Sequence, residues 1–204
     1  MDNLVLQSLT KWPAVPNCFG WLALDRRGRW RIRSEYAQKY NLPGEVIQNS
    51  NLNNFITRNY SRDQIGRYFF QNGPQRVFIT LDAAPWIVRI TPSNEVLQLV
   101  TQCQNEFHPQ EALSDESGNI FISGITVQSI LKDEGVPTFI QLNQPSIALL
   151  HDHDLGLFSD LAKLDTHSCS LESSWNWLGR RLPIHPIHSL EIPSRFGFNK
   201  NPVE

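Results

Sequence analysis

The pattern of hydrophobic and polar residues is most regular between residues 68 and 90, where aromatic and β-branched side chains are densest. Apolar runs at 68–70 and 77–81 flank the polar segment 71–76, whose Asn-Gly-Pro sequence is typical of a turn. The pattern predicts a β-hairpin followed, after a proline-containing break, by a third strand over 86–90. We expect three antiparallel strands with one apolar face, which needs a cover of other elements.

Further strands and helices are predicted on both sides of this segment. An Asp-Arg-Arg-Gly turn predicts a second hairpin over 19–33. Asn49 or Ser50 is a suitable N-cap for an amphipathic helix that runs to Tyr60, which we expect to cover the sheet. Residues 95–103 fit a helix or a strand, and we interpret them as a strand. Other strands are predicted at 120–123, 138–142 and 147–150, and other helices at 34–40, 126–134 and 155–164.

Two parts of the chain share a pattern of turn and strand. The residues Asp25, Gly28, Trp30 and Ile32 correspond, 90 positions on, to Asp115, Gly118, Ile120 and Ile122. In both parts a short helix, a strand, an Asn-x-Pro turn and another strand are predicted to follow. The pattern fits an internal duplication, and it equally fits the repeated use of the same few residues in hairpin turns.

These elements predict an α+β fold with mostly antiparallel sheets and short covering helices. We expect two small subdomains, related if the duplication is real: a β-rich one over 1–95 and an α+β one over 96–165. From 166 to 204 the composition shifts to Ser, His, Pro and Trp, which predicts an extended tail. We expect this tail to pack back through Trp175 and Trp177 and to end in a loose stretch.

The overall charge disfavours polyanion binding. The 204 residues include 18 basic and 20 acidic side chains, so no excess of positive charge attracts nucleic acid or an anionic membrane. Five arginines lie within Arg26–Arg33. We interpret them as a solvated hairpin face, and a phosphate site is the alternative.

Membrane and redox patterns indicate a cytoplasmic protein. The apolar runs are shorter than the ~18 residues that span a bilayer, and the N-terminus lacks the features of a signal peptide. The three cysteines, Cys18, Cys103 and Cys169, lack the spacing of a disulfide framework or a zinc knuckle. We therefore expect a reducing compartment.

Residues of about 12–160 carry a family resemblance. The segments concerned are Lys11-Trp12-Pro13, Cys18-Phe19-Gly20-Trp21-Leu22, GRYFFQNGPQRVFITLDAAPW and LLHDHDL. With these segments the chain resembles an uncharacterised proteobacterial family known only as a domain of unknown function, and more loosely a second such family. The resemblance implies a bacterial, cytoplasmic, sheet-rich protein, and it supplies no catalytic residue.

The sequence His151-Asp152-His153-Asp154 is the sharpest chemical cluster. In an extended segment the two histidines project to the same side, and two imidazoles with one carboxylate suit a divalent transition metal. We take His151, His153 and Asp154 as the candidate ligands, with Asp152 as the other choice of carboxylate. The structural alternative is that Asp152 or Asp154 caps the following helix while the histidines are solvated.

The predicted turn at 71–76 and its surroundings form a candidate binding site. The residues are Gln71, Asn72, Arg76, Asp82 and Trp86. Their amides, guanidinium, carboxylate and indole are able to recognise a small polar ligand or a peptide carboxylate. The alternative is structural: Arg76 forms an ion pair with Asp82 or Asp63 across the sheet.

Catalytic motifs of known spacing are absent from the sequence. It has no Gly-x-Ser-x-Gly nucleophile motif and no glycine-rich phosphate loop. We therefore expect a non-catalytic module that binds a small ligand or a protein, with no cofactor, no nucleic acid and no membrane partner. The alternative is a metal-dependent, hydrolase-like enzyme built on the 151–154 cluster. Self-association through strand edges or the tryptophans of the tail is a third hypothesis.

Overall fold

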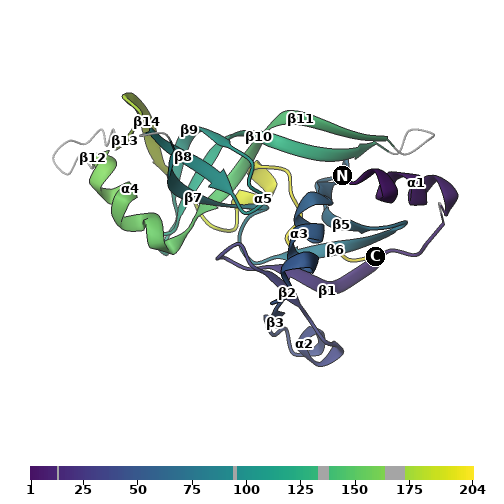
Figure 1. Ribbon diagram of the computed structural model, residues 1–204. Helices are drawn as coiled ribbons and strands as arrows, with labels where there is room; N and C mark the ends of the chain where they lie inside the picture. The colour runs from purple at the N-terminus through teal and green to yellow at the C-terminus, as the bar shows by residue number, and fades with distance from the viewer. Residues whose placement is uncertain (13, 94–95, 133–137, 164–172) are drawn as a thin grey trace.

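The computed structural model describes residues 1–12, 14–93, 96–132, 138–163 and 173–204 (Figure 1). The helices are α1 (Asn3–Lys11), α2 (Glu35–Lys39), α3 (Ser50–Arg58), η1 (Asp152–Asp154), α4 (Leu155–Leu161) and α5 (Ile192–Arg195). The strands are β1 (Cys18–Leu24), β2 (Trp30–Ile32), β3 (Glu45–Val46), β4 (Tyr60–Arg62), β5 (Tyr68–Asn72), β6 (Gln75–Leu81), β7 (Trp86–Ser93), β8 (Val96–Thr101), β9 (Phe107–Ser114), β10 (Ile120–Lys132), β11 (Thr138–Leu150), β12 (Ala162–Lys163), β13 (Ser174–Trp177) and β14 (Arg180–Pro186).

The strands form one curled sheet with few helices around it. Its main order is β12-β13-β14-β9-β10-β4-β5-β6-β1-β2-β3, and β11, β7 and β8 extend from β10 as a branch. Most pairings are antiparallel, whereas β1–β6, β11–β7, β14–β9 and the single pair between β10 and β4 are parallel. An α+β fold is therefore confirmed, while the division into two related subdomains stays a prediction. No helix in the described part of the chain is long and apolar enough to cross a bilayer.

The predicted hairpin over 68–81 is confirmed, but the three-strand meander is wrong. β5 and β6 pair in antiparallel fashion, with Phe69 opposite Phe78. The next strand, β7, pairs with β11 and β8, and the other neighbour of β6 is β1. Residues 83–85 are buried and the backbone N–H of Asp82 donates to Leu24 O, so the break redirects the chain instead of returning it beside β6.

The helix α3 covers the β5–β6 hairpin, as predicted. Its N-cap is Asn49, whose side-chain oxygen accepts from the backbone N–H of Leu52 at 2.9 Å. The ring of Phe55 packs edge-on against Phe70, with 5.3 Å between centroids, and Ile56 is buried below it. Burial of this apolar stripe is the main contribution that holds the helix to the sheet.

Five strands close into a ring at the other end of the molecule (Figure 1). β7 pairs with β8 and β11, β11 with β10, and β10 with β9. A bridge between Val100 of β8 and Glu106, the residue before β9, completes the circle. One face of these strands is apolar, because Val88, Ile122 and Ala148 lie on the same side of them and are fully buried.

The helix expected over 126–134 is wrong, because the described part of this segment belongs to β10. Val127 and Leu131 suggested helical spacing, but Thr126 and Gln128 are buried and satisfied instead. Thr126 Oγ1 donates to Glu106 O at 2.8 Å, and Tyr68 OH donates to Gln128 Oε1 at 2.9 Å. Because the buried positions of this part of the strand carry polar side chains, the sequence lacks the alternation of apolar and polar residues that is typical of a strand.

The partner strand β11 is also continuous. The turn predicted at residues 143–146 lies within it, paired with residues 124–127 of β10. The residues that connect β10 to β11, 133–137, lie outside the described part of the chain. The two separate strands predicted at 138–142 and 147–150 are therefore one strand.

One type of turn recurs between strands. In each turn a side-chain oxygen of the first residue, an Asp, accepts from the backbone N–H groups two and four residues later. The residue three positions after the Asp is a glycine with positive φ. The turns are 25–29, 63–67 and 115–119. The first and last were expected, and the middle one was not recognised. The repeated order of elements after the turn does not hold, since a strand stands where the second helix was predicted.

The C-terminal region is part of the sheet. β14 lies parallel to β9, and Trp175 is buried against Phe158 of α4 with 5.1 Å between ring centroids. The expectation of a loose last stretch is wrong, because Leu81 N donates to Lys200 O at 2.8 Å and Phe198 is buried. The first residues of the expected tail, up to 172, lie outside the described residues, and Cys169 is among them.

Candidate functional site

The structure separates the five residues expected to form a ligand site. Gln71 and Arg76 are opposite each other in the β5–β6 hairpin, next to the exposed Asn72. Asp82 follows the other end of β6, about 20 Å away at 3.3 Å per residue. Trp86 is 97% buried in the core, and its ring lies edge-on to Tyr60 at 5.3 Å. These residues therefore do not make up one site.

The histidine cluster lies where β11 meets η1. The backbone N–H of His151 donates to Val88 O at 3.0 Å, and Asp154 N donates to His151 O at 2.9 Å. His151 is buried, and its Nδ1 accepts from the backbone N–H of His153 at 3.2 Å. Asp154 stands before α4 without a side-chain capping bond. The expected capping role is thus taken by a histidine, at η1.

Asp154 is bound by Arg89, an arginine distant in the sequence, and does not face the histidines. Its two oxygens accept from Arg89 Nε at 2.6 Å and Nη2 at 3.1 Å, and the backbone N–H of Ile90 adds a third bond at 3.0 Å. The carboxylate raises the pKa of Arg89 through this hydrogen bond. Asp154, which we expected to be a metal ligand, is therefore a structural anchor between β7 and α4.

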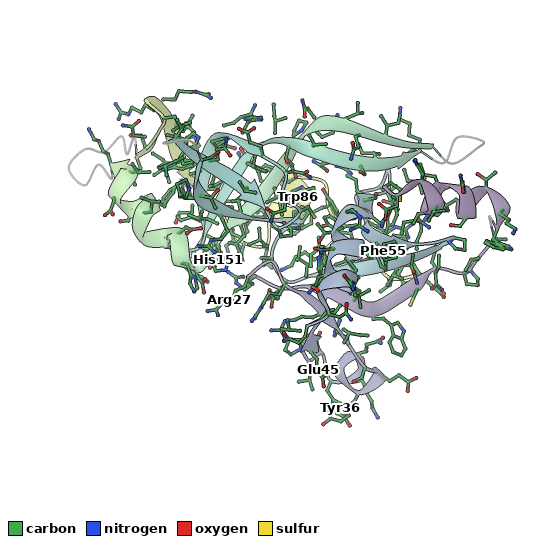
Figure 2. The ribbon with its side chains drawn as sticks, viewed as in Figure 1. Arg27, Tyr36, Glu45, Phe55, Trp86 and His151 are labelled. Atoms are coloured by element: carbon green, nitrogen blue, oxygen red, sulfur yellow. The ribbon has the colours of Figure 1, made fainter. Side chains whose placement is uncertain are left out.

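Asp152, and not Asp154, is the carboxylate that lies beside the two histidines. One donor atom from each of His151, Asp152 and His153 lies within 4.8 Å of the others. Asp152 Oδ1 is 2.8 Å from His151 Nδ1, while Oδ2 accepts from Arg27 Nη2 at 2.8 Å. Figure 2 shows Arg27 and His151 close together at this junction.

The protonation of this cluster follows from its surroundings. Burial lowers the pKa of His151, and the positive charge of Arg89 acts in the same direction. Burial alone would raise the pKa of Asp152, but the hydrogen bond and charge of Arg27 outweigh it and lower that pKa. The surroundings therefore oppose the charged form of His151 and favour the charged form of Asp152.

A pocket of about 530 Å³ opens beside the cluster. Its charged lining consists of Arg27 and Arg89, and His151, Gln102 and Gln104 also line it. Both arginines already have carboxylate partners, Asp152 and Asp154. Their charges are therefore neutralised within the protein.

A second pocket, of about 370 Å³, lies beside Arg33, a residue that the sequence did not single out as a ligand residue. Arg33 follows β2 and is only 7% exposed. Its donors reach uncharged oxygens: Leu42 O at 3.1 Å, Asn41 Oδ1 at 3.3 Å, Thr80 Oγ1 at 3.4 Å and Ala37 O at 3.5 Å. No carboxylate forms an ion pair with Arg33 in the described part of the chain.

The other charged residues of this pocket do not neutralise Arg33. Asp25 lines it, but Asp25 Oδ2 is bound by Arg29 and Arg31, each at 2.8 Å. Asp82 lines it as well and is exposed, as the one predicted ligand residue that belongs to this pocket. One clue to this pocket was present in the sequence, the run of arginines after residue 25, but the pocket joins segments from residue 23 to residue 201.

Comparisons with known proteins place the chain in a family. The DUF2944 family model, described as "Protein of unknown function (DUF2946)", matches residues 1–203. The chain belongs to this family. The predicted resemblance to a domain of unknown function is thereby confirmed.

One solved structure shows a distant likeness to this family member. It is the crystal structure of a DUF1285 family protein from Silicibacter pomeroyi DSS-3, which is 14% identical. The match covers 83% of this chain and 82% of that chain, with a TM-score of 0.43. No curated protein matches the chain.

Proposed function

We propose that the protein is a small-ligand-binding module whose pocket at Arg33 takes a molecule with a carboxylate group. The single observation that carries this proposal is a buried guanidinium with no carboxylate partner in the described part of the chain, on the wall of a pocket of about 370 Å³. An uncompensated buried charge costs several kcal/mol, so a ligand that supplies the opposite charge is stabilised there.

The donors of Arg33 leave room for such a ligand. A guanidinium has five N–H groups, and the four bonds of Arg33 to protein oxygens leave one of them free within the described residues. The bond to Thr80 Oγ1, at 3.4 Å, is also weak and easily exchanged. A carboxylate oxygen is the stronger acceptor, because a charge-assisted hydrogen bond is about twice as strong as a neutral one.

The rest of the pocket limits what the ligand is. Leu24, Leu42, Pro43 and Leu81 supply an apolar wall for a short hydrocarbon part. Asp82, at the edge, accepts hydrogen bonds from an amine or hydroxyl. The volume suits a small organic or amino acid, since it lies near the lower end of ligand pockets, which begin at about 300 Å³.

The direct test is calorimetric titration of the full chain with acetate, propionate and alanine, after native mass spectrometry for a co-purified acid. Arg33→Gln is expected to weaken binding about tenfold or more. A tenfold change in Kd corresponds to a loss of about 1.4 kcal/mol of binding free energy. Lys39→Gln, an exposed charge change on α2 outside the pocket, is the matched control and should bind like the wild type.

A milder variant guards against misfolding of Arg33→Gln. Thr80→Val keeps the shape of the side chain and removes only the weak bond to Arg33, so it is expected to fold and to change affinity by about threefold or less. Absence of binding to the wild-type chain, or equal binding by the wild type and a folded Arg33→Gln, would contradict the proposal.

A further inference from the structure

We propose that His151, Asp152 and His153 form a binding site for a divalent transition-metal ion, with zinc the best chemical match. This site is separate from the Arg33 pocket and does not depend on the proposed function. Among the described residues, it is the one group of three histidine, cysteine or acidic side chains whose donors come this close, within 4.8 Å. Two imidazoles and a carboxylate are donors that zinc accepts in proteins.

The distances are near those that an ion requires. Donor atoms bound to one tetrahedral zinc ion at about 2.1 Å are about 3.4 Å apart. Asp152 Oδ1 is 2.8 Å from His151 Nδ1 and 3.9 Å from His153 Nε2. An ion bound at Nδ1 replaces the hydrogen bond that this atom accepts from His153 N. The imidazole of His153 is 64% exposed, and its ring centroid is 4.7 Å from that of His151, so solvent and not packed side chains surrounds most of it.

The backbone that carries the three side chains is held on both sides. His151 N is bonded to Val88 O of β7, and Asp154 is clamped by Arg89 and Ile90 N of the same strand. The triplet therefore sits on a fixed turn, which lowers the entropy that an ion must overcome to order its ligands.

Arg27 completes the arrangement as a partner of the carboxylate. It binds Asp152 Oδ2 through Nε and Nη2, at 3.2 and 2.8 Å, and leaves Oδ1 facing the histidines. A hydrogen bond to the outer oxygen of a ligating carboxylate is a usual way to orient it. Three protein ligands also leave one coordination position open, and His151 lines the neighbouring pocket together with Arg27.

The test is metal uptake by the full chain after chelator treatment and dialysis. Titration with Zn²⁺ is expected to saturate at about one ion per chain, and Co²⁺ should give the visible absorption of a low-coordinate site. His153→Ala, at an exposed residue, is expected to weaken Zn²⁺ binding about tenfold or more, and Asp152→Asn to weaken it as well.

His108 provides the matched control, because it is exposed and pairs with a single acidic residue, Glu106, at 3.7 Å. His108→Ala should bind Zn²⁺ like the wild type. The proposal is overturned if the wild type takes up no stoichiometric ion, or if His108→Ala lowers the affinity as much as His153→Ala does. Circular dichroism of each variant confirms that a loss of binding is not a loss of fold.

Discussion

Arg33 and Arg89 both lie beside pockets of the same sheet, yet their charges are handled in opposite ways. Arg89 forms a two-bond pair with Asp154, 65 residues further along the chain. Arg33 is more deeply buried and contacts only uncharged oxygens in the described part of the chain. The difference teaches that an arginine near a pocket is a candidate for ligand binding when its counter-charge is missing, and a structural residue when its counter-charge is built in.

The largest expected effect comes from removing the built-in counter-charge. Asp154→Ala leaves Arg89 without its carboxylate and Ile90 N without an acceptor in a buried place. We expect the free energy of unfolding to fall by about 2–3 kcal/mol, less than for a fully buried pair because Arg89 is half exposed. Urea denaturation measures this, with Asp160→Ala on the exposed face of α4 as control.

Replacing the unpaired arginine should cost less. Arg33→Met removes four hydrogen bonds to neutral oxygens but also removes a buried charge that no carboxylate compensates. We expect a loss of about 1 kcal/mol of unfolding free energy, together with loss of carboxylate binding. A loss as large as that of Asp154→Ala would show that the Arg33 charge is structurally required, and the contrast between the two arginines would fail.

The smallest effect is expected at Asp25, the occupied carboxylate of the Arg33 pocket. Burial alone would raise its pKa, but hydrogen bonds from the backbone of Arg29 and the side chain of Arg31 outweigh it and lower that pKa. A lowered pKa in the folded state stabilises the protein above about pH 4 and loses this effect as the pH falls through the folded value. Asp25→Asn should therefore flatten the acid side of a pH–stability curve below about pH 4.

The same variant also tests the charge balance of the pocket. Asp25→Asn removes one negative charge from the lining, so acetate should bind more tightly, by a few-fold. Titration at neutral pH measures this change. Unchanged binding would show that the charge of Asp25 does not act on the ligand, and weaker binding would argue that Asp25 helps to hold it.

Elements with local causes could be predicted from the sequence. The β5–β6 hairpin follows from its Asn-Gly-Pro turn, and α3 from its Asn49 cap and apolar stripe. The start of β10 was predicted at 120–123, but its continuation was not, because the inward Thr126 and Gln128 are satisfied by Glu106 and Tyr68 from elsewhere in the chain. The partners of β7 were missed for a related reason, since strand pairing depends on contacts across many residues.

The candidate sites divide in the same way. The histidine cluster was visible because its members are consecutive in the sequence, but the choice between Asp152 and Asp154 depends on Arg89, more than 60 residues earlier. The Arg33 pocket was not foreseen, because the absence of a carboxylate partner is a property of the folded chain and not of any local pattern.

The two ends of the sheet bear on how copies of the protein meet. In the described part of the chain the main strand order terminates at β3 and β12, and each of these strands is only two residues long. Edge strands this short offer little template for another molecule to add a strand. Short edge strands are one way in which natural sheets avoid aggregation. Encounters between copies are thereby steered away from backbone pairing and toward side-chain surfaces.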